Sequence, residues 1–285
     1  EVGGGRSPVT KKSESVVVEH SVKRSIIAVS GVADFEIVEG RRISVWPAPG
    51  AATRDMEIFL FGPAWATLCH QRGLLPLHAS AILTANGIAA IVGHSGAGKS
   101  TSAAWLTKMG YELVADDILP ISYGANSRPG AWPYLRRFKL HRDVITELGW
   151  LPIQPVGASF DKHKFFVSPI RSCDDQWRRL DRIYLIQNEM PGSQLQIEPL
   201  SGADAVAVLL DHTYRFDFIR DTRKCGAHLE LCARLASQVE IYRIHKPATK
   251  NPGEMVSATI HQHIENANLI TDNEAVPKHG ERRSC

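Results

Sequence analysis

The sequence predicts an α/β fold built around a phosphate-binding loop, and three observations carry that prediction. Residues 93–100 read Gly-His-Ser-Gly-Ala-Gly-Lys-Ser, a complete G-x-x-x-x-G-K-S motif. Residues 88–92 before it are apolar and typical of a buried strand, and residues 101–109 after it are typical of a helix. A second apolar run, residues 111–115, ends in two consecutive aspartates. Strand, glycine-rich turn, helix and strand in this order favour an α/β core.

The segment before this core reads as mostly β structure. Short runs of β-branched and aromatic residues alternate with turn residues, and one helix follows them. That helix contains Gly62 and Pro63, which predict a break or kink, and Gly73 predicts its end. The expected strands are 16–18, 26–29, 35–38 and 43–46, and the expected helix is 56–72.

A hairpin is expected immediately before the loop. Residues 77–83 form an apolar run, and Asn86 and Gly87 are a strong two-residue turn signal. Counting back from that turn sets His78 opposite Ser95. We therefore expect the His78 imidazole beside the phosphate loop, contacting phosphate or orienting a base; a strand-end histidine with a satisfied hydrogen bond is the alternative.

The phosphate loop has a defined chemistry. Its backbone N–H groups would cradle phosphate oxygens at a helix N-terminus, Lys99 would reach the β- and γ-phosphates, and the Ser100 hydroxyl would ligate Mg²⁺. An ordinary glycine-rich turn is the alternative. The expected nucleotide-binding residues are Gly93, His94, Ser95, Gly96, Ala97, Gly98, Lys99, Ser100 and Thr101.

Asp116 and Asp117 end the strand that follows the loop helix. Ligands of open α/β sheets bind outside the carboxyl ends of the strands, so a strand adjacent to the loop strand would bring both carboxylates to the γ-phosphate. We expect Asp116 to accept a proton from an attacking hydroxyl and Asp117 to position the metal. The sequence alone does not distinguish this assignment from the reverse one. Aspartates that merely cap the next turn are the alternative.

The remaining chain continues as an α/β domain and then rises in polarity. These patterns predict four parts: a disordered tail at 1–15, a β-rich segment with one helix at 16–73, a catalytic domain at 74–246, and a poorly ordered tail at 247–285. The later expected helices are 142–148, 203–210 and 228–237, and the later strands are 180–187 and 239–244.

Three of these pieces together resemble a known family. Residues 77–80 (Leu-His-Ala-Ser), the loop 93–100 and residues 113–117 (Leu-Val-Ala-Asp-Asp) are similar to the core of the HPr kinase/phosphorylase superfamily, whose fold is related to that of phosphoenolpyruvate carboxykinase. The resemblance implies a kinase that uses ATP and Mg²⁺ to phosphorylate a serine of a peptide or small protein. Weaker likenesses at 161–165 and 211–215 point to lasso-peptide precursor kinases, whose acceptor is the precursor's C-terminal serine.

The chain also departs from the HPr kinases. His94 stands where they commonly carry Asp, and neither their separate N-terminal domain nor their arginine-containing C-terminal signature is recognisable. These departures put HPr as the substrate, and the reverse phosphorolysis, in doubt. Relatives form oligomers, so a homo-oligomer is compatible with the resemblance.

Basic residues after the core are candidates for contacts to phosphate or substrate. A kinase needs cations to neutralise the transferring phosphoryl group. Arg137, Lys162 and Lys164 are the candidates, and a solvated basic face is the alternative.

Composition excludes several classes of protein. The chain has 285 residues, 44% of them hydrophobic, and a formal net charge of only +3, which does not imply a nucleic-acid partner. Five scattered cysteines lack the spacing of zinc sites and indicate reduced thiols in a cytoplasm. Polar residues interrupt the apolar stretch 74–93, so no membrane partner is expected.

Two rival functions remain open. A kinase of sugars or other small metabolites would use the same loop and aspartates. A nucleotide-binding regulatory protein with little turnover would need the loop but has less need for a base.

Overall fold

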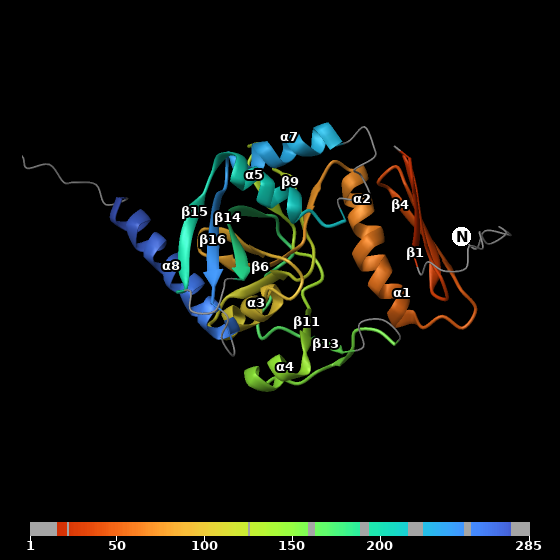
Figure 1. Cartoon of the computed structure of the whole chain (residues 1–285), viewed down its shortest axis with the longest axis horizontal. Coiled ribbons are helices and arrows are strands. Elements are labelled where there is room, and N and C mark those ends of the chain that lie inside the picture. The colour runs from red at the N-terminus through yellow and green to blue at the C-terminus, as the bar shows by residue number, and fades with distance from the viewer. Residues whose placement is uncertain are drawn as a thin grey trace, which may run out of the picture.

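A mixed α/β structure is found in the computed structural model, which describes residues 16–21, 23–124, 126–158, 163–188, 194–215, 225–247 and 252–274. Within these ranges the strands form a small N-terminal sheet, a large central sheet and a three-stranded sheet, flanked by helices (Figure 1). The α/β class predicted from the sequence is confirmed. The tail expected at 1–15 lies outside the described residues.

The N-terminal sheet is an antiparallel meander with strand order β1-β2-β3-β4. Residues in β2 alternate between buried and half-buried, as expected for a sheet with one covered face. Its core side chains, including Ile27, Phe35 and Ile37, pack against Phe59 and Leu68 of the following helices. The strands are β1 (Val16–His20), β2 (Arg24–Val29), β3 (Ala33–Val38) and β4 (Arg42–Pro47).

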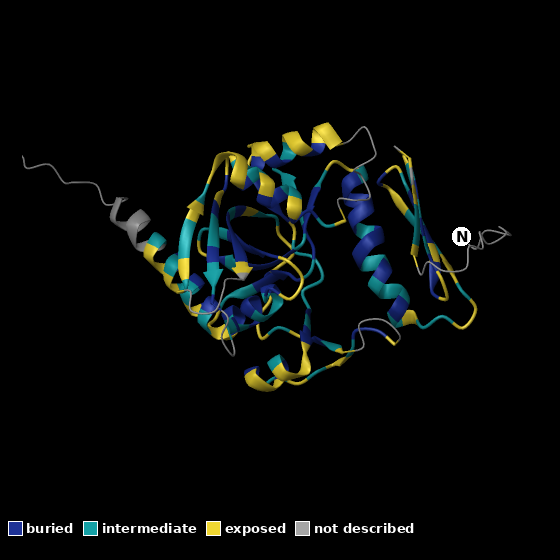
Figure 2. Cartoon of the chain, viewed as in Figure 1, coloured by how far each residue is buried: buried dark blue, intermediate teal, exposed yellow. Residues whose placement is uncertain are grey.

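The expected kinked helix is present, and the kink is a π-helical turn. Pro63 lies inside this turn, where its missing N–H group removes a normal helical hydrogen bond. The helical segment lies between the N-terminal sheet and the rest of the protein, and much of it is buried (Figure 2). Its parts are α1 (Thr53–Phe59), η1 (Leu60–Ala64) and α2 (Trp65–Gln71).

The central sheet is covered on both faces. Along β7, Ile88, Ala90 and Val92 point into the cluster that contains α5 and α7, whereas Ala89 and Ile91 point into the cluster with α3, α4 and α8. This alternation is the period of a strand buried on both sides. The covering helices are α3 (Lys99–Lys108), α4 (Arg142–Leu148), α5 (Gly202–Asp211), α7 (Cys225–Ala236) and α8 (Pro252–Glu274).

The strand order of the central sheet is β5-β9-β10-β14-β7-β6-β8, and β16 pairs with both β14 and β15. Strand β14 runs parallel to β7 and to β16. The strands are β5 (Leu75–Leu77), β6 (Ala79–Thr84), β7 (Gly87–Val92), β8 (Glu112–Ala115), β9 (Leu119–Tyr123), β10 (Pro129–Ala131), β14 (Arg178–Asn188), β15 (Gln196–Leu200) and β16 (Glu240–Lys246).

A third, antiparallel sheet has the order β11-β13-β12 and lies beside α4. Buried Phe138 and Val167 join it to the core cluster around α3. The strands are β11 (Phe138–His141), β12 (Gln154–Pro155) and β13 (Lys164–Val167).

The hairpin before the loop has a different register from the one expected. Thr84 pairs with Gly87, so the turn is Ala85 and Asn86 rather than Asn86 and Gly87. Continuing the ladder from Ala79–Val92 sets His78 level with Gly93, not with Ser95. A shift of two residues keeps every side chain on its expected face, so His78 still lies at the loop end of the sheet.

The strand that carries the aspartates is not adjacent to the loop strand, contrary to the expectation. β6 lies between β8 and β7 and is antiparallel to both. The carboxyl ends of β7 and β8 therefore still meet at one edge of the sheet. Asp116 and Asp117 reach the phosphate loop across the start of β6.

The poorly ordered tail expected at 247–285 is wrong for its central part, because residues 252–274 form helix α8. Val256, Ile260 and Ile264 are fully buried, recur every four residues, and pack with α3. Residues 248–251 and 275–285 lie outside the described residues. No helix in the described part of the chain has the length and apolar character needed to cross a membrane.

Candidate active site

The phosphate loop joins β7 to α3 through three glycines with positive φ. These angles are 152° at Gly93, 81° at Gly96 and 105° at Gly98. At Gly93 a side chain is also excluded by space, because a Cβ atom would lie 2.8 Å from the carbonyl oxygen of Ile186. The motif therefore has glycine where the backbone requires it.

The tip of the loop is open to solvent. His94, Ser95 and Gly96 are exposed, and Lys99 begins α3. The free N–H groups and the dipole of a helix N-terminus favour an anion at this place. The loop is therefore suited to the phosphates of a nucleotide.

Lys99 is held at the loop by carbonyl groups. Its Nζ donates to the oxygens of Gly93 at 2.7 Å and of His94 at 3.3 Å. Burial lowers the pKa of this ammonium, while Asp117 and Asp116 act in the opposite direction. A lysine tethered by weak neutral acceptors can exchange them for a charged phosphate oxygen, which is the stronger partner.

Asp116 is buried at 3% exposure and accepts several hydrogen bonds. The Ser80 hydroxyl donates to Oδ1 at 2.6 Å, and the main-chain N–H of Lys139 donates to Oδ2 at 3.0 Å. Burial raises the pKa of Asp116 despite these donors. The nearby Ser100 hydroxyl also acts to lower the pKa of this carboxyl. Ser80 lies on β6, which pairs with β7, so its hydrogen bond links Asp116 to the strand that leads into the phosphate loop.

Asp117 has a strained backbone and two basic neighbours. Its φ is 82°, in the left-handed region that non-glycine residues rarely adopt. Lys139 Nζ lies 2.6 Å from Oδ2, and His78 Nδ1 lies 3.3 Å from Oδ1. Burial acts to raise the pKa of Asp117, but the charge of Lys139 and the hydrogen bond from its ammonium act in the opposite direction, and the pKa is lowered. This carboxylate is therefore ionised at neutral pH.

His78 is placed between β5 and β6, at the same sheet edge. Its Nδ1 lies 2.9 Å from the carbonyl oxygen of Asp117, and its main-chain N–H donates to His212 O at 2.8 Å. Burial lowers the pKa of this imidazole, more than Asp117 raises it, so the ring is neutral at neutral pH. A neutral ring that donates from Nδ1 to a carbonyl presents Nε2 as an acceptor.

Lys139 was missed as a site residue by sequence reasoning. It lies in the basic run of residues 136–139, but its charge carried no signal that distinguished it from its neighbours. The structure places it on β11, where its main chain holds Asp116 and its ammonium pairs with Asp117.

The three expected basic contacts have different surroundings. The Arg137 guanidinium lies 3.8 Å from the centre of the Phe166 ring, and its Nη2 lies 3.6 Å from Glu57 Oε2. Lys164 is half-buried on β13 and acts electrostatically on both Asp117 and Lys99. Lys162 lies outside the described residues.

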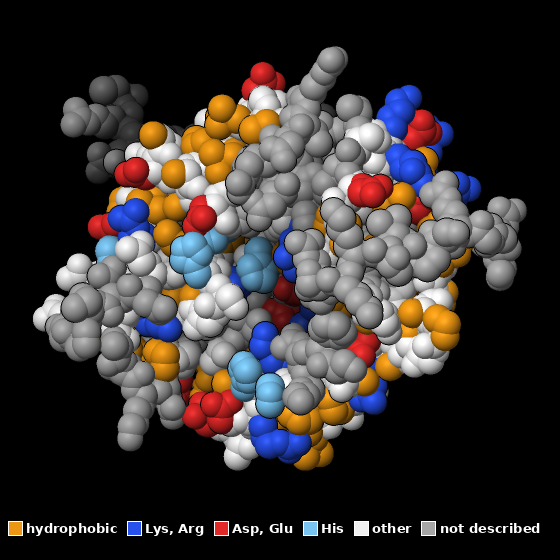
Figure 3. All heavy atoms as spheres, turned by 45° about the vertical axis from the view of Figure 1, so that its right-hand side comes forward, with side chains coloured by type: hydrophobic (Ala, Val, Ile, Leu, Met, Phe, Trp, Pro, Cys, Tyr) orange, Lys and Arg blue, Asp and Glu red, His pale blue; other side chains and the backbone are white. Residues whose placement is uncertain are grey.

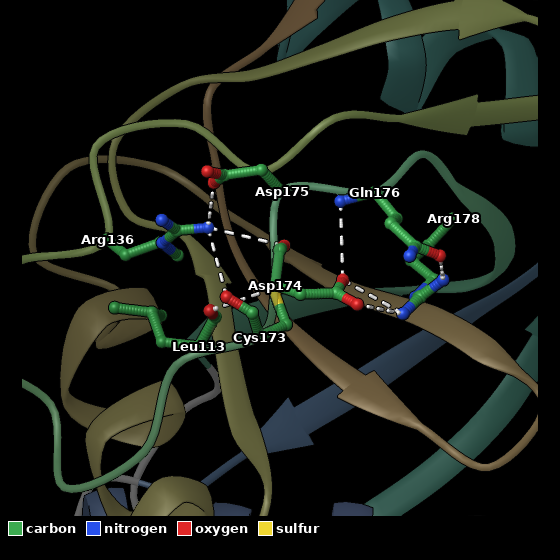
Figure 4. A network of polar contacts seen from close by, with 7 residues as sticks. All are labelled: Leu113, Arg136, Cys173, Asp174, Asp175, Gln176 and Arg178. Carbon is green, nitrogen blue, oxygen red and sulfur yellow. Dashed lines mark hydrogen bonds and ion pairs between the residues drawn. The ribbon is translucent and has the colours of Figure 1, made fainter.

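Arg136 contacts residues 173–175 and not the two aspartates of the site. Its Nη1 donates to the carbonyl oxygens of Cys173 and Asp174 at 3.0 and 3.3 Å and pairs with Asp175 at 2.6 Å (Figure 4). Cys173 in turn bonds through N and Sγ to the carbonyl of Leu113 in β8. Arg136 therefore fixes a loop against the strand that carries the aspartates.

The donor set fits a magnesium ion. Ser100, Asp116 and Asp117 offer hydroxyl and carboxylate oxygens, the ligands that Mg²⁺ prefers. Asp116 is buried at 3% exposure, and a nearby cation would compensate for the cost of burying its charge. These residues would hold the ion between the loop and the aspartates.

One face of the protein carries a hollow (Figure 3). In Figure 3 acidic side chains lie at the floor of this hollow, with basic and histidine side chains around them. The side chains of His78 and Asp117 are 32% and 23% exposed, and residues 94–96 are exposed, so the sheet edge that gathers them is open to solvent.

Comparison with known proteins adds a weak structural likeness. No protein-family model and no curated protein matches the sequence. Among solved structures, the Hpr(Ser) kinase/phosphatase from Coxiella burnetii is similar with a TM-score of 0.35 and 12% sequence identity, covering 72% of this chain and 99% of that chain. These values are low, and a likeness of this degree carries no functional assignment.

Proposed function

We propose that this protein is an ATP- and Mg²⁺-dependent kinase that phosphorylates a hydroxyl group, most specifically a serine of a peptide or small protein. The observation that carries the proposal is the hydrogen bond of 2.6 Å from Ser80 Oγ to Asp116 Oδ1, because Ser80 lies on β6, which pairs with the strand β7 that leads into the phosphate loop. It joins a phosphate cradle, a metal-binding hydroxyl and two carboxylates at one accessible sheet edge. Phosphoryl transfer needs these groups together.

The loop and Lys99 would hold the phosphates of ATP. Backbone N–H groups of residues 93–98 donate to phosphate oxygens, and the Lys99 ammonium leaves its carbonyl partners for the β- and γ-phosphates. Ser100 and Asp116 would hold Mg²⁺, which supplies electrostatic neutralisation of the transferring phosphoryl group. This assigns the metal side to Asp116, the reverse of the assignment favoured by the sequence.

Asp117 is then the group that takes the proton. The serine Oγ forms a bond to the γ-phosphorus, the bond from that phosphorus to the β–γ bridging oxygen breaks, and the hydroxyl proton passes to Asp117. The Asp117 side chain is 23% exposed, whereas Asp116 is enclosed by its donors. Lys139 keeps Asp117 ionised, and Lys139 and His78 together fix its position.

Two observations favour a peptide as the acceptor: the exposure of the site and the sequence resemblance. The exposure of Asp117 and of the loop residues 94–96 admits a chain segment, and Lys164, whose charge acts on Asp117 and Lys99, offers a cation for the phosphorylated product. The likeness of residues 161–165 and 211–215 to lasso-peptide precursor kinases makes the C-terminal serine of such a precursor the specific candidate. A small-molecule kinase is the second candidate, since the same loop and carboxylates serve it equally.

The first experiment is phosphoryl transfer from ATP to a panel of peptides that end in serine, read by mass spectrometry. We expect one added phosphate on serine, lost in Lys99→Ala. Release of ADP with no phosphopeptide would refute the peptide acceptor and direct the search to small hydroxyl compounds. Binding of ATP without turnover would refute the kinase and favour a regulatory protein.

A second experiment separates the two aspartates. Asp116→Asn should raise the Mg²⁺ concentration needed for half-maximal rate, whereas Asp117→Asn should lower kcat with an unchanged Mg²⁺ requirement. Removal of a proton acceptor should cost about 10²–10⁴-fold in kcat. Circular dichroism and urea unfolding would show that each variant is folded. The opposite pattern would return the base to Asp116.

A further inference from the structure

A second group of possible metal ligands includes one side chain of the phosphate loop, and the side chains of this group have no role in the proposed reaction. Nε2 of His94 lies 3.4 Å from Oδ2 of Asp211, and Nε2 of His212 lies 3.8 Å from the same oxygen. The ligand atoms of all three residues lie within 4.8 Å of one another. His94 belongs to the loop, whereas Asp211 ends α5 and His212 follows it. Two distant segments thus converge on one carboxylate oxygen.

The distances are too long for good hydrogen bonds and suitable for an intervening ion. An N–H group bonded to oxygen lies about 2.7–3.2 Å from it. Two ligand atoms about 2.1 Å from a tetrahedral metal ion lie about 3.4 Å apart. The separations of 3.4 and 3.8 Å therefore approach those expected around a bound metal with small movements of exposed side chains.

The chemical nature of the ligands selects the class of metal. Two imidazole nitrogens and one carboxylate oxygen suit Zn²⁺ and similar first-row transition ions, whereas Mg²⁺ prefers oxygen ligands. The ring of His212 is buried at 4% exposure, and the His94 ring meets it edge-on with centroids 5.1 Å apart. His94 and Asp211 are exposed, so an ion can enter and a water molecule can complete its coordination.

We propose that His94, Asp211 and His212 bind a zinc-like transition-metal ion that ties the phosphate loop to the end of α5. The carbonyl of His94 also accepts a hydrogen bond from Lys99, so the ion would fix the loop conformation that holds this lysine. The charge of Asp211 favours the ion, and the nearby Lys99 opposes it. The proposal does not depend on the kinase assignment, since binding at this site requires no nucleotide and no turnover.

The test is a titration of the full chain with Co²⁺, a coloured substitute for Zn²⁺, after treatment with a chelator. An excess of Mg²⁺ is present to occupy oxygen-rich sites, and no nucleotide is added. We expect one equivalent of Co²⁺ with the visible absorption of a nitrogen-ligated ion, displaced by one equivalent of Zn²⁺. Zn²⁺ should also raise the Tm of the protein.

Variants decide whether these three residues are the ligands. Even residues that only support a metal ligand change affinity by about 10–100-fold, so His94→Gln and Asp211→Asn should each weaken Co²⁺ binding at least tenfold. Both side chains are exposed, so neither change should unfold the protein. His261→Gln removes a histidine on α8, remote from the cluster, and should leave the affinity unchanged.

Two results would overturn the proposal. The first is Co²⁺ binding to the unaltered chain without the visible absorption of a nitrogen-ligated ion, or with a dissociation constant several orders of magnitude above the micromolar range. The other is an affinity that is the same in His94→Gln as in the unaltered chain, which would place the ion elsewhere. Neither result bears on phosphoryl transfer, which the peptide assay measures separately.

Discussion

Lys139 Nζ lies 2.6 Å from Oδ2 of Asp117, while the main-chain N–H of the same lysine donates to Asp116 Oδ2 at 3.0 Å. One residue of β11 therefore holds both carboxylates of the candidate site. Because β11 belongs to the three-stranded sheet and the aspartates follow β8, this lysine also couples two separate sheets at the site. The ammonium of Lys139 contacts Asp117 and its main-chain N–H contacts Asp116. A side-chain substitution at Lys139 therefore tests the ion pair and leaves the main-chain hydrogen bond in place.

Lys139→Met should destabilise the protein at neutral pH by about 2 kcal/mol, because it leaves the Asp117 carboxylate partly buried without its main cation. Lys139→Arg keeps the positive charge and should therefore lower the free energy of unfolding by less than Lys139→Met does. Urea unfolding measures both.

The effect of Lys139→Met should depend on pH with a definite sign. Since the pKa of Asp117 is lowered in the folded state, its contribution is present above the unfolded pKa of about 4 and is lost as pH falls through the folded value. The stability difference between the two proteins should therefore shrink in acid. An equal difference at neutral and acid pH would contradict the ion pair.

Gly93→Ala should destabilise the protein by about 3 kcal/mol. Its φ of 152° disfavours a side chain, and the new Cβ atom would approach the carbonyl oxygen of Ile186 to 2.8 Å. Gly226→Ala is the matched control, because Gly226 lies in α7 with nothing within 4 Å of the added atom. The control should be neutral or stabilising by about 0.5 kcal/mol. Thermal unfolding of both proteins tests the contrast, and similar Tm values would contradict it.

The chemistry at the centre of the site was predictable because it depends on local patterns. The glycine spacing of residues 93–98 demands positive φ at particular positions, and Asp116 and Asp117 end an apolar strand. Strand and helix identities nearby followed from hydrophobic runs of the right length. None of these inferences required knowledge of which strands pair.

Other features depended on long-range pairing, which local patterns do not contain. The insertion of β6 between β7 and β8 cannot be read from any of the three strands alone. The hairpin register was misplaced by two residues because Ala85 and Asn86, not Asn86 and Gly87, form the turn. Lys139 and His212 reach the site only through such long-range contacts. The resemblance of residues 211–215 to a family marked the segment of His212 but gave this residue no role.

The protein should lose stability in mild acid, because the buried His212 ring resists protonation in the folded state. Burial lowers the pKa of its imidazole to about 4, with Asp211 opposing the change and His94, Lys99 and His78 adding to it. Because the folded pKa lies below the unfolded value of about 6.5, stability is complete above pH 6.5 and is lost as pH falls toward 4. The loss should reach about 3 kcal/mol at most, since a tenfold change in a protonation equilibrium corresponds to about 1.4 kcal/mol.

The measurement for His212 is urea unfolding with a chelator present, at neutral pH and near pH 4.5. Since other buried histidines also resist protonation, the informative quantity is the difference between the unaltered chain and His212→Gln, whose side chain does not titrate. That difference should change in favour of the variant as the pH falls. A difference independent of pH would show that His212 titrates normally.

The helix at the C-terminal side of the chain gives the last prediction. Ile260 is fully buried in the cluster formed with α3, and Ser257 donates to the Ser102 carbonyl of that helix at 3.0 Å. Ile260→Ala should therefore cost about 3 kcal/mol, the usual range for removing a large aliphatic side chain from a core. Gln262→Ala, two residues on and exposed, should change the free energy of unfolding by less than about 0.5 kcal/mol.

The same pair of variants tests more than stability, because α3 begins at the phosphate loop. If α8 supports α3, Ile260→Ala should also weaken ATP binding at temperatures where the protein remains folded, whereas Gln262→Ala should not. Isothermal titration with ATP and Mg²⁺ measures this directly. Equal stability of the two variants would mean that α8 is dispensable for the core. Unequal stability with equal ATP affinity would mean that the phosphate loop is held by β7 and the α3 N-terminus without help from α8.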